Sequence, residues 1–388
     1  MRASRFVFLL SLNAAAASLS AQSSPAAIVY ALPPSAGALP STSSVRFGDE
    51  LMEYDGVVSV VPLRAGGIVV ANGGTTQIRF FDRNGRLVRE VGRGGGGPGE
   101  YMDIGGVVAL PGDTLLVWDG IARRATVLTP AGAYVRAFAL EAPFEGGGSV
   151  TRVVALASGD VLIGFSEVRT TAPSASARSF GERLVQFSST GQRRTGTELR
   201  LASSDRFVQT VPPEFGGVAY WDLAFGRTLT VQPTASGVAI GDGTSWEIEV
   251  RSSPEYATRS RHRLDRTPAL VTPADIAAFR ERALRGERGA SRVIAERMVA
   301  EMPFPKSQPA YVRFNTDEHD NLWIEDYLTR RDSTAVWYRL SPATRRAVAI
   351  RMPPRFEPFA FAEGLVLGVL RDQDDVERVV GFSVRTVR

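Results

Sequence analysis

The sequence contains no cysteine and only two histidines, His262 and His319. Without cysteine the chain can form no disulfide, has no thiolate metal ligand, and offers no thiol for attachment of a lipid. A zinc site is not expected either, because two histidines supply few of the ligands that zinc prefers. The 388 residues must therefore be held together by a hydrophobic core, which a chain of this length can provide.

An excess of charge of one sign is also lacking. The chain has 45 Lys and Arg against 41 Asp and Glu, a net charge of +4, and Lys306 is its only lysine. This balance does not favour nucleic-acid binding, which requires clustered positive charge. After the first 21 residues no apolar run approaches the roughly 20 residues that a membrane-spanning helix needs. We expect no nucleic-acid partner and no membrane span after signal removal.

The N-terminal residues have the pattern of a signal peptide. Arg2 and Arg5 precede an apolar run from Phe6 to Leu12, and small residues continue to Ala21. The run is short for a transmembrane anchor, which is the alternative interpretation. We therefore expect residues 1–21 to be removed, residues 22–43 to be a linker, and the protein to be exported to the periplasm or out of the cell.

One short pattern, a turn residue followed by an apolar strand, recurs six times along the chain. The copies begin at Gly67, Thr114, Asp160, Gly237, Asn321 and Gly364, so their starts lie 47, 46, 77, 84 and 43 residues apart. A four-stranded propeller blade takes about 40–50 residues. Apolar and alternating strands, joined by Gly-, Pro- and Asn-containing turns, flank each copy as in an antiparallel meander. The two long gaps therefore contain one insertion each.

The last copy lacks its fourth strand. Residues 378–387 fit a third strand, while Ser44–Gly48 resembles the end of the fourth strand in the first copy, Leu87–Gly92. Pairing these two segments would close a ring and remove its open edges. The sequence therefore predicts an all-β fold, a six-bladed β-propeller over residues 44–388 that is closed by an N-terminal strand near residues 44–48.

The two insertions span about residues 202–226 and 267–309. The second is predicted to be helical, with Thr272 as N-cap, Pro273 at the first helical position and Asp275 in the first turn. A second helix is expected over residues 291–302. Both insertions precede the first strand of a blade, so we expect them on one face of the propeller. The helical insertion is either a packing element or a lid or docking element.

Polar residues end the second strand in most copies. The four that we select as candidates for a ligand face are Asn72, Asp119, Asp242 and Asp326, with Glu167 and Asp372 near the corresponding places of the other two copies. A ring of such oxygens could hold Ca²⁺. The alternative interpretation is that Asp and Asn simply begin the turns that follow. We therefore expect no cofactor, with calcium as the one possibility.

A glycine-rich segment, residues 93–101, joins the first blade to the second. Its clustered glycines could present backbone N–H groups to an anion, and its charged residues Arg93 and Glu100 are further candidates for the ligand face. The segment lacks the Lys-Ser/Thr of a P-loop, and no helix follows it. The simpler interpretation is a structural turn between blades.

Other chemistry finds little support in the sequence. Asp317–Asn321 contains His319 but does not have the spacing of an EF-hand loop, and it is typical of a turn. His262 lies in a predicted fourth strand and is expected at the surface. The Gly-x-Ser-x-Gly motif of a nucleophile elbow is absent, and no catalytic triad can be located.

Three segments carry a family resemblance, namely residues 79–85, the linker 91–101 and residues 317–323. Together they resemble the bacterial six-bladed β-propeller family related to NHL repeats. The resemblance covers residues 44–388 and implies an exported propeller, but it transfers no catalytic residue. Fold alone does not decide function. We predict a non-enzymatic binding or protein-interaction propeller with an unknown protein or small-molecule ligand. The alternative is a Ca²⁺-dependent hydrolase resembling gluconolactonase-type propellers, with the strand-end carboxylates as metal ligands.

Overall fold

The fold is mostly β. The computed structural model describes residues 25–145, 147–167, 176–328 and 334–384, so the expected signal peptide, residues 1–21, lies outside the described residues. Within them the strands form six sheets of four or five strands each, accompanied by two α-helices and two short 3-10 helices, Pro111–Asp113 and Pro213–Phe215. Neither of the two α-helices combines the length and apolar character that crossing a membrane requires.

The first three sheets consist of consecutive antiparallel strands, as the repeat pattern predicts. The first sheet contains β4 (Val57–Pro62), β5 (Ile68–Asn72), β6 (Gln77–Phe81) and β7 (Leu87–Val91). The second contains β8 (Ile104–Ala109), β9 (Leu115–Asp119), β10 (Arg124–Leu128) and β11 (Tyr134–Ala139). The third contains β12 (Gly147–Ala155), β13 (Val161–Glu167), β14 (Ser176–Phe187), β15 (Arg193–Thr210) and β16 (Val218–Asp222).

The last three sheets each add a strand from the N-terminal part of the chain. The fourth sheet contains β17 (Thr230–Thr234), β18 (Gly237–Gly241), β19 (Glu247–Ser252), β20 (Ala257–Leu264) and β1 (Ala27–Tyr30). The fifth contains β21 (Tyr311–Thr316), β22 (Leu322–Asp326), β23 (Val336–Ser341), β24 (Arg346–Arg351) and β2 (Ala36–Ala38). The sixth contains β25 (Phe356–Ala362), β26 (Leu365–Arg371), β27 (Glu377–Ser383) and β3 (Val45–Phe47).

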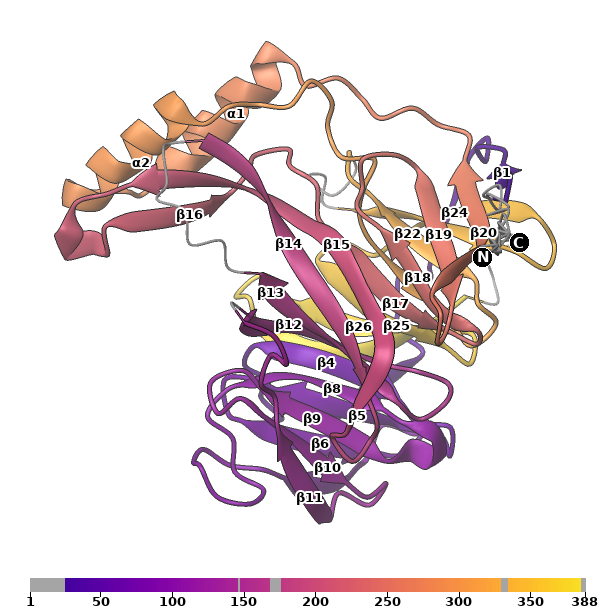
Figure 1. The fold of residues 1–388 in the computed structure, drawn as a ribbon. Helices are drawn as coiled ribbons and strands as arrows, with labels where there is room; N and C mark the ends of the chain where they lie inside the picture. Colours follow the sequence, from indigo (N-terminus) through magenta and orange to yellow (C-terminus); the bar gives the residue numbers. More distant parts are fainter. Residues whose placement is uncertain (1–24, 146, 168–175, 329–333, 385–388) are drawn as a thin grey trace, which may run out of the picture.

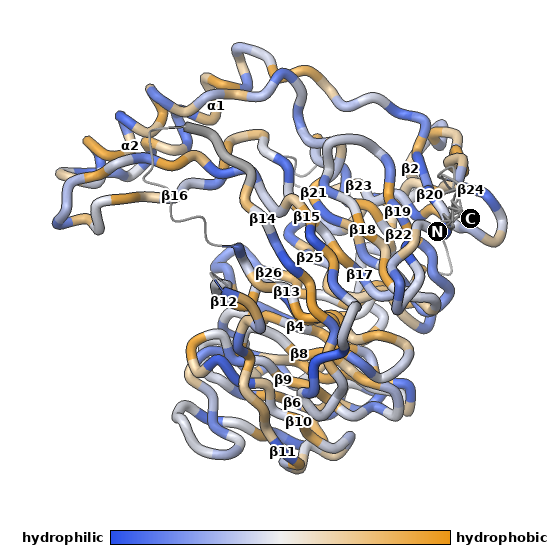
Figure 2. The backbone as a smooth tube through the Cα atoms, viewed as in Figure 1, coloured by the Kyte–Doolittle hydropathy of each residue, from blue (hydrophilic) through white to orange (hydrophobic). Residues whose placement is uncertain are grey.

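The hydrophobic core lies between neighbouring sheets. The first strands of the sheets contact one another in the order β4, β8, β12, β17, β21, β25, and β25 contacts β4 in turn. A buried apolar cluster fills each of the six spaces between consecutive sheets. Figure 2 shows stretches of hydrophobic residues along many of these strands. Burial of these layers is the main source of stability for a chain without disulfides.

The N-terminal segment 25–47, which we call the strap, runs along the outer edges of three sheets. β1 pairs in parallel with β20, and β2 pairs in parallel with β24. β3 pairs antiparallel with β27, with Phe47 opposite Val379. The linker expected over residues 22–43 thus contains two strands. They form because Tyr30 and Leu39 are buried against the sheets, which a solvated linker would not allow.

His262 shows what the strap covers. The expectation that this residue lies at the surface is wrong, because β1 lies along β20 and leaves His262 only 3% exposed. Its Nδ1 is 2.8 Å from the Tyr30 hydroxyl, and its Nε2 is 2.9 Å from the Ser260 hydroxyl. Burial disfavours the imidazolium and lowers the pKa of His262 below its ordinary value of 6.5.

Because His262 is buried under the strap, we expect the free energy of unfolding to fall in acid. Because the pKa of His262 is lower in the folded state than in the unfolded state, its contribution to stability is complete above pH about 6.5 and declines as the pH falls through the folded pKa. In His262→Gln the unfolding free energy should therefore depend less on pH between about pH 7 and 5. Denaturant titrations across this range measure the slope. His319→Gln, at an exposed histidine, is the control, and an equal effect of both substitutions would contradict the prediction.

Both expected insertions form one substructure, the canopy, at one end of the sheets (Figure 1). The first insertion contains the end of β15 and all of β16, which pairs with β15 as the fifth strand of the third sheet. The second forms α1 (Pro273–Leu284) and α2 (Gly289–Glu301). Thr272 is the N-cap of α1 as predicted, and its side chain forms a capping box with Asp275. The insertions share a core in which Phe207 and Phe225 pack with Met298 and Met302.

Candidate functional site

The strand pairing defines two rims of the molecule. The start of β4, the end of β5 and the start of β6 lie together, because Val57 pairs with Asn72 and Asn72 pairs with Gln77. We call this end of the sheets the upper rim. It carries the connections between sheets, the connections between the second and third strands, and the canopy. The opposite end, with the remaining hairpin connections, is the lower rim.

Asn72 and Asp119 occupy equivalent places on the upper rim and make equivalent contacts. Asn72 Oδ1 accepts a hydrogen bond from the Asp55 backbone N–H at 2.8 Å. Asp119 Oδ2 accepts one from the Met102 N–H at 2.7 Å, and its Oδ1 accepts another from Ala122 at 2.7 Å. Each side chain thus binds the connection that enters its sheet and also the turn that follows its strand, Asn72 through a 2.8 Å hydrogen bond from its Nδ2 to Thr75 Oγ1.

Asp242 and Asp326 combine a turn contact with an arginine. Asp326 accepts hydrogen bonds from Arg266 Nη1 at 2.7 Å and from the Leu328 N–H at 3.0 Å. Asp242 accepts from the Thr244 N–H at 3.0 Å, and Arg227 Nη1 lies 3.5 Å away. Both arginines stand where the chain enters or leaves the canopy. Negative charge at these two strand ends is therefore balanced by cationic side chains of the chain itself.

The four strand-end residues do not appear as a cluster of side chains close enough together to hold a metal ion. Within the described ranges, the only three acidic or histidine side chains close enough together are Asp317, Glu318 and His319, on the lower rim. Asp317 already accepts hydrogen bonds from the N–H groups of His319 and Asn321, the Asn321 amide and the Trp323 indole. These contacts are those of a turn that is tied to the following strand.

The glycine-rich linker closes on its own carboxylate. Glu100 Oε2 accepts the Gly97 N–H at 2.8 Å, while Oε1 accepts Arg93 Nη2 at 2.7 Å. These two contacts, the Gly97 bond foremost, hold the pKa of Glu100 below its ordinary value. Arg124 also donates to the Gly96 carbonyl at 2.9 Å. The Gly97 N–H, which could have bound an external anion, thus donates to Glu100 instead, and Arg93 balances the negative charge of Glu100.

Arginine–glutamate pairs along the sheets were not anticipated from the sequence. Arg152 on β12 makes two hydrogen bonds to Glu182 at 2.6 and 3.0 Å, and Glu182 is fully buried. In the fifth sheet Arg313 contacts Glu325 at 2.9 Å. The available signal is a lone arginine inside an otherwise apolar first strand, as in Thr-Arg-Val-Val and Tyr-Val-Arg-Phe.

A chain of further contacts links the sixth sheet to its neighbours. Arg313 lies 3.5 Å from Glu357, and Arg371 contacts both Glu357 at 3.0 Å and Glu377 at 2.7 Å. Glu377 Oε2 then accepts the Val57 N–H of the first sheet at 3.0 Å. These groups are engaged with one another, so they stabilise the junction between the fifth, sixth and first sheets.

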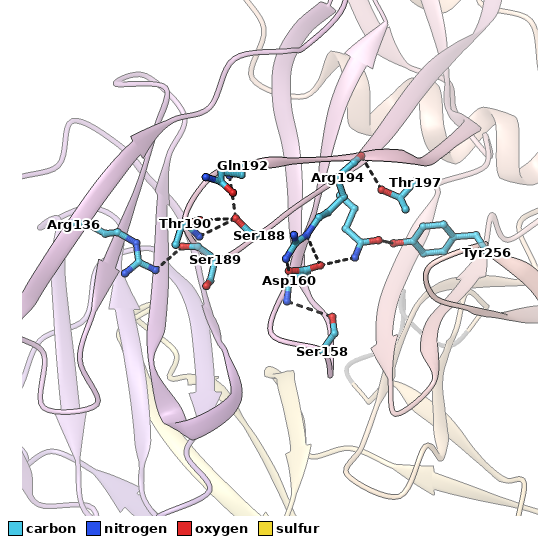
Figure 3. A network of polar contacts seen from close by, with 11 residues as sticks. Arg136, Ser158, Asp160, Ser188, Ser189, Thr190, Gln192, Arg194, Thr197 and Tyr256 are labelled. Carbon is cyan, nitrogen blue, oxygen red and sulfur yellow. Dashed lines mark hydrogen bonds and ion pairs between the residues drawn. The ribbon is translucent and has the colours of Figure 1, made fainter.

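A polar network on the lower rim joins the third sheet to the fourth (Figure 3). Asp160 accepts hydrogen bonds from Arg194 at 2.9 and 3.0 Å and from Gln186 at 2.8 Å, and Gln186 accepts the Tyr256 hydroxyl at 2.9 Å. Burial alone would raise the pKa of Asp160, but the donors outweigh it and hold the pKa below its ordinary value. Burial raises the pKa of Tyr256 to about 12.

Exposed hydrophobic side chains are distributed unequally between the rims. Those on the upper rim and canopy are Leu51, Val58, Met102, Ile121, Phe215, Tyr220, Leu270, Val293, Leu328 and Val376. In the described part of the chain, the hairpin connections of the lower rim contribute no large exposed hydrophobic residue. The remaining ones lie on the strap or on the outer strands β7 and β11. Exposed apolar side chains are thus more numerous on the upper rim and canopy than on the lower rim, and an excess of this kind can mark an interaction surface.

Two small cavities lie between sheets. One, of about 290 Å³, opens on the lower rim between the second and third sheets and includes Arg136 and Ser189. The other, of about 230 Å³, lies on the upper side between the third and fourth sheets, and its walls include Asp242, Glu247 and Glu249. Glu249 is held by Arg251 at 2.6 Å and Arg261 at 2.8 Å, so the acidic wall is already neutralised.

Comparison with known proteins adds information on the fold alone. No family model and no curated protein matches the chain. A crystal structure from Bacteroides fragilis, provisionally described as an exported protein, is 10% identical and has a TM-score of 0.50, with 93% of this chain and 100% of that chain covered.

Two further solved structures match the chain with lower TM-scores. A virginiamycin B lyase from Staphylococcus aureus is 10% identical with a TM-score of 0.43, covering 87% of this chain and 97% of that one. A protein provisionally described as a gluconolactonase is 11% identical with a TM-score of 0.42, covering 92% and 94%. At such similarity the two say nothing about the activity of this chain. The many sheets described above, with the cyclic contacts of their first strands, are consistent with a propeller-type fold.

Proposed function

We propose that this chain is an exported, six-bladed β-propeller of the NHL-related bacterial type, closed by β3, and that it acts as a non-enzymatic binding module. The six sheets, the cyclic contacts of their first strands and the pairing of β3 with β27 support the architecture. The binding surface in this proposal is the upper rim together with the canopy. Its ligand is a protein or a small molecule.

The observation that carries this proposal is the unequal distribution of exposed apolar side chains. Met102 and Ile121 are 57% and 62% exposed on the upper rim, where water contact with such groups is unfavourable. The lower-rim hairpins of the described residues contribute none, and the adjoining starts of β7 and β11 contribute four, namely Leu87, Val88, Tyr134 and Val135. A partner that covers the upper rim would remove this apolar area from water, and non-polar contacts of this kind supply much of the binding energy at interfaces.

The alternative function, a Ca²⁺-dependent hydrolase, requires free oxygens that converge. Such a site would need several carboxylate or amide oxygens within bonding distance of one ion. Asn72, Asp119, Asp242 and Asp326 instead contact local N–H groups or arginines. These engagements favour the interpretation that polar residues end the second strands in order to fasten turns.

Site-specific photo-crosslinking tests the binding surface. A benzophenone amino acid at Met102 or Ile121 should yield crosslinked adducts when the protein is expressed in its own cells, because these side chains lie in the proposed interface. Val88 is the matched control, since it is 68% exposed on the outer strand β7. Adducts of equal yield at Val88, or none at Met102 and Ile121, would show that the upper rim is not the binding surface.

A calcium titration separates the two functions. If a native-state site binds Ca²⁺, the stability gained is about 2.7 kcal/mol at one hundred times the dissociation constant. The binding-module proposal expects no change in melting temperature with millimolar Ca²⁺. A rise that Asp119→Asn abolishes would favour the hydrolase instead.

A further inference from the structure

The cavity on the lower rim is a candidate ligand site separate from the upper rim. It has a volume of about 290 Å³, close to the lower limit of about 300 Å³ for small-molecule pockets. Leu110, Val127, Pro130 and Val135 supply apolar walls from the second sheet. Ser189 supplies part of the opposite wall from the third sheet. A cavity of this size and lining suits a small ligand with a compact apolar body.

Arg136 is the charged residue in this lining. Its Nη2 donates one hydrogen bond of 2.7 Å to the Ser189 carbonyl, which fixes the side chain across the gap between the sheets. Its Nε is buried and finds no acceptor among the described residues. By contrast, Arg152 on β12 meets the carboxylate of the buried Glu182. Arg136 forms no such ion pair with the described residues.

The charge of Arg136 therefore lacks a local counter-ion at this cavity. No acidic residue is among the described residues that line it. The nearest polar cluster does not compensate, because Asp160 already binds Arg194 through both carboxylate oxygens. A guanidinium presents five N–H donors in a planar fork that matches a carboxylate. One of its donors is occupied by Ser189.

We propose that this cavity binds a small monocarboxylate with an aryl or short alkyl body. The carboxylate would accept hydrogen bonds from Arg136, and the apolar body would lie against Pro130 and Val135, which are exposed apolar residues of this lining. No covalent step is involved. The proposal is independent of the upper-rim interface, since it concerns the opposite end of the sheets.

The sequence offers a matched control for Arg136. Arg89 occupies the same register position of the neighbouring first sheet: it pairs with Phe80 on β6 just before a β-bulge, as Arg136 pairs with Val127 on β10. Both follow two exposed hydrophobic residues, Leu87-Val88 and Tyr134-Val135. Arg89 does not line the cavity. Its replacement therefore removes an equivalent arginine without touching the proposed site.

Ligand-observed NMR titration with benzoate tests the proposal. For a ligand of this size we expect a dissociation constant of about 0.5–10 mM. Arg136→Gln should weaken binding by about 10-fold or more, because a charge-assisted hydrogen bond is lost. Arg89→Gln should leave it unchanged. Benzamide, which has the same shape but no charge, should bind about 10-fold more weakly than benzoate.

Three results would overturn the proposal. They are the absence of saturable benzoate binding below about 50 mM, equal affinity of wild type and Arg136→Gln, and equal affinity for benzoate and benzamide. If Arg136→Gln fails to fold, as judged by circular dichroism, Val135→Trp decides the matter. This substitution keeps the arginine and fills the cavity, so it should abolish binding, and retained affinity would count against the site.

Discussion

Removal of the strap is expected to unfold the protein or to leave it barely stable. A chain that begins at Gly48 loses β1, β2 and β3 together with the buried side chains of Tyr30, Leu39 and Phe47. Burial of each such side chain contributes roughly 1.5–3 kcal/mol, or about 5–9 kcal/mol for the three. Whole domains are stable by only about 5–15 kcal/mol. The truncated sixth sheet would also expose the edge of β27.

The measurement is thermal or denaturant unfolding of two purified chains. One begins at residue 48, and the control begins at residue 25 and keeps the entire strap. The shorter chain should aggregate or melt far below the control, whereas the control should behave like the mature protein. A cooperative transition of the shorter chain within a few degrees of the control would show that the sheets do not need the strap.

Arg152→Met is expected to destabilise the protein by about 3–5 kcal/mol, the second large effect. The substitution leaves the fully buried Glu182 with the Ser203 hydroxyl, at 3.2 Å, as the one remaining side-chain donor within the described ranges. Breaking a buried pair on one side costs this much because an uncompensated charge stays inside. The double substitution Arg152→Met with Glu182→Gln removes the charge as well. It should therefore recover much of the loss.

Denaturant unfolding of the single and double variants checks this asymmetry. Arg200→Met is the control, because Arg200 pairs with Glu198 at 3.3 Å while its side chain remains 66% exposed. Exposed pairs of this kind contribute about 0–1 kcal/mol. If the double variant proved less stable than Arg152→Met alone, the cost would lie in lost packing or hydrogen bonding, and the buried charge would not explain it.

The strands could be predicted from the sequence because their signals are local. The copies that begin at Gly67 and Asn321, for example, coincide with β5 (Ile68–Asn72) and β22 (Leu322–Asp326). Period-two apolar patterns and turn glycines act over a few residues, so one sequence suffices to find them. The helix that begins at Pro273 was predictable for the same reason, since its capping box spans four residues.

The candidate site could not be predicted as well, because its chemistry depends on distant partners. Nothing near Asp326 in the sequence indicates that Arg266, from the preceding sheet, would approach it. The ring of oxygens was predicted because polar residues end the second strand in several copies of the repeat. An equivalent position in the repeat does not determine the direction of the side chain. Burial of His262 likewise depends on β1, more than 200 residues away. Such contacts are set by packing, and no local pattern encodes them.

The strap also has a consequence for how this chain folds. The segment that is synthesised early pairs with β20, β24 and β27, so its partners exist only after most of the chain has been made. Contacts between residues so far apart require closure of very long loops, and folding rates fall as such contacts dominate. The four strands of the first sheet, β4 to β7, are consecutive in the chain and can pair as soon as they have been synthesised. Completion of the structure should then be a slow late event, and refolding should show a phase that depends on residues 25–47.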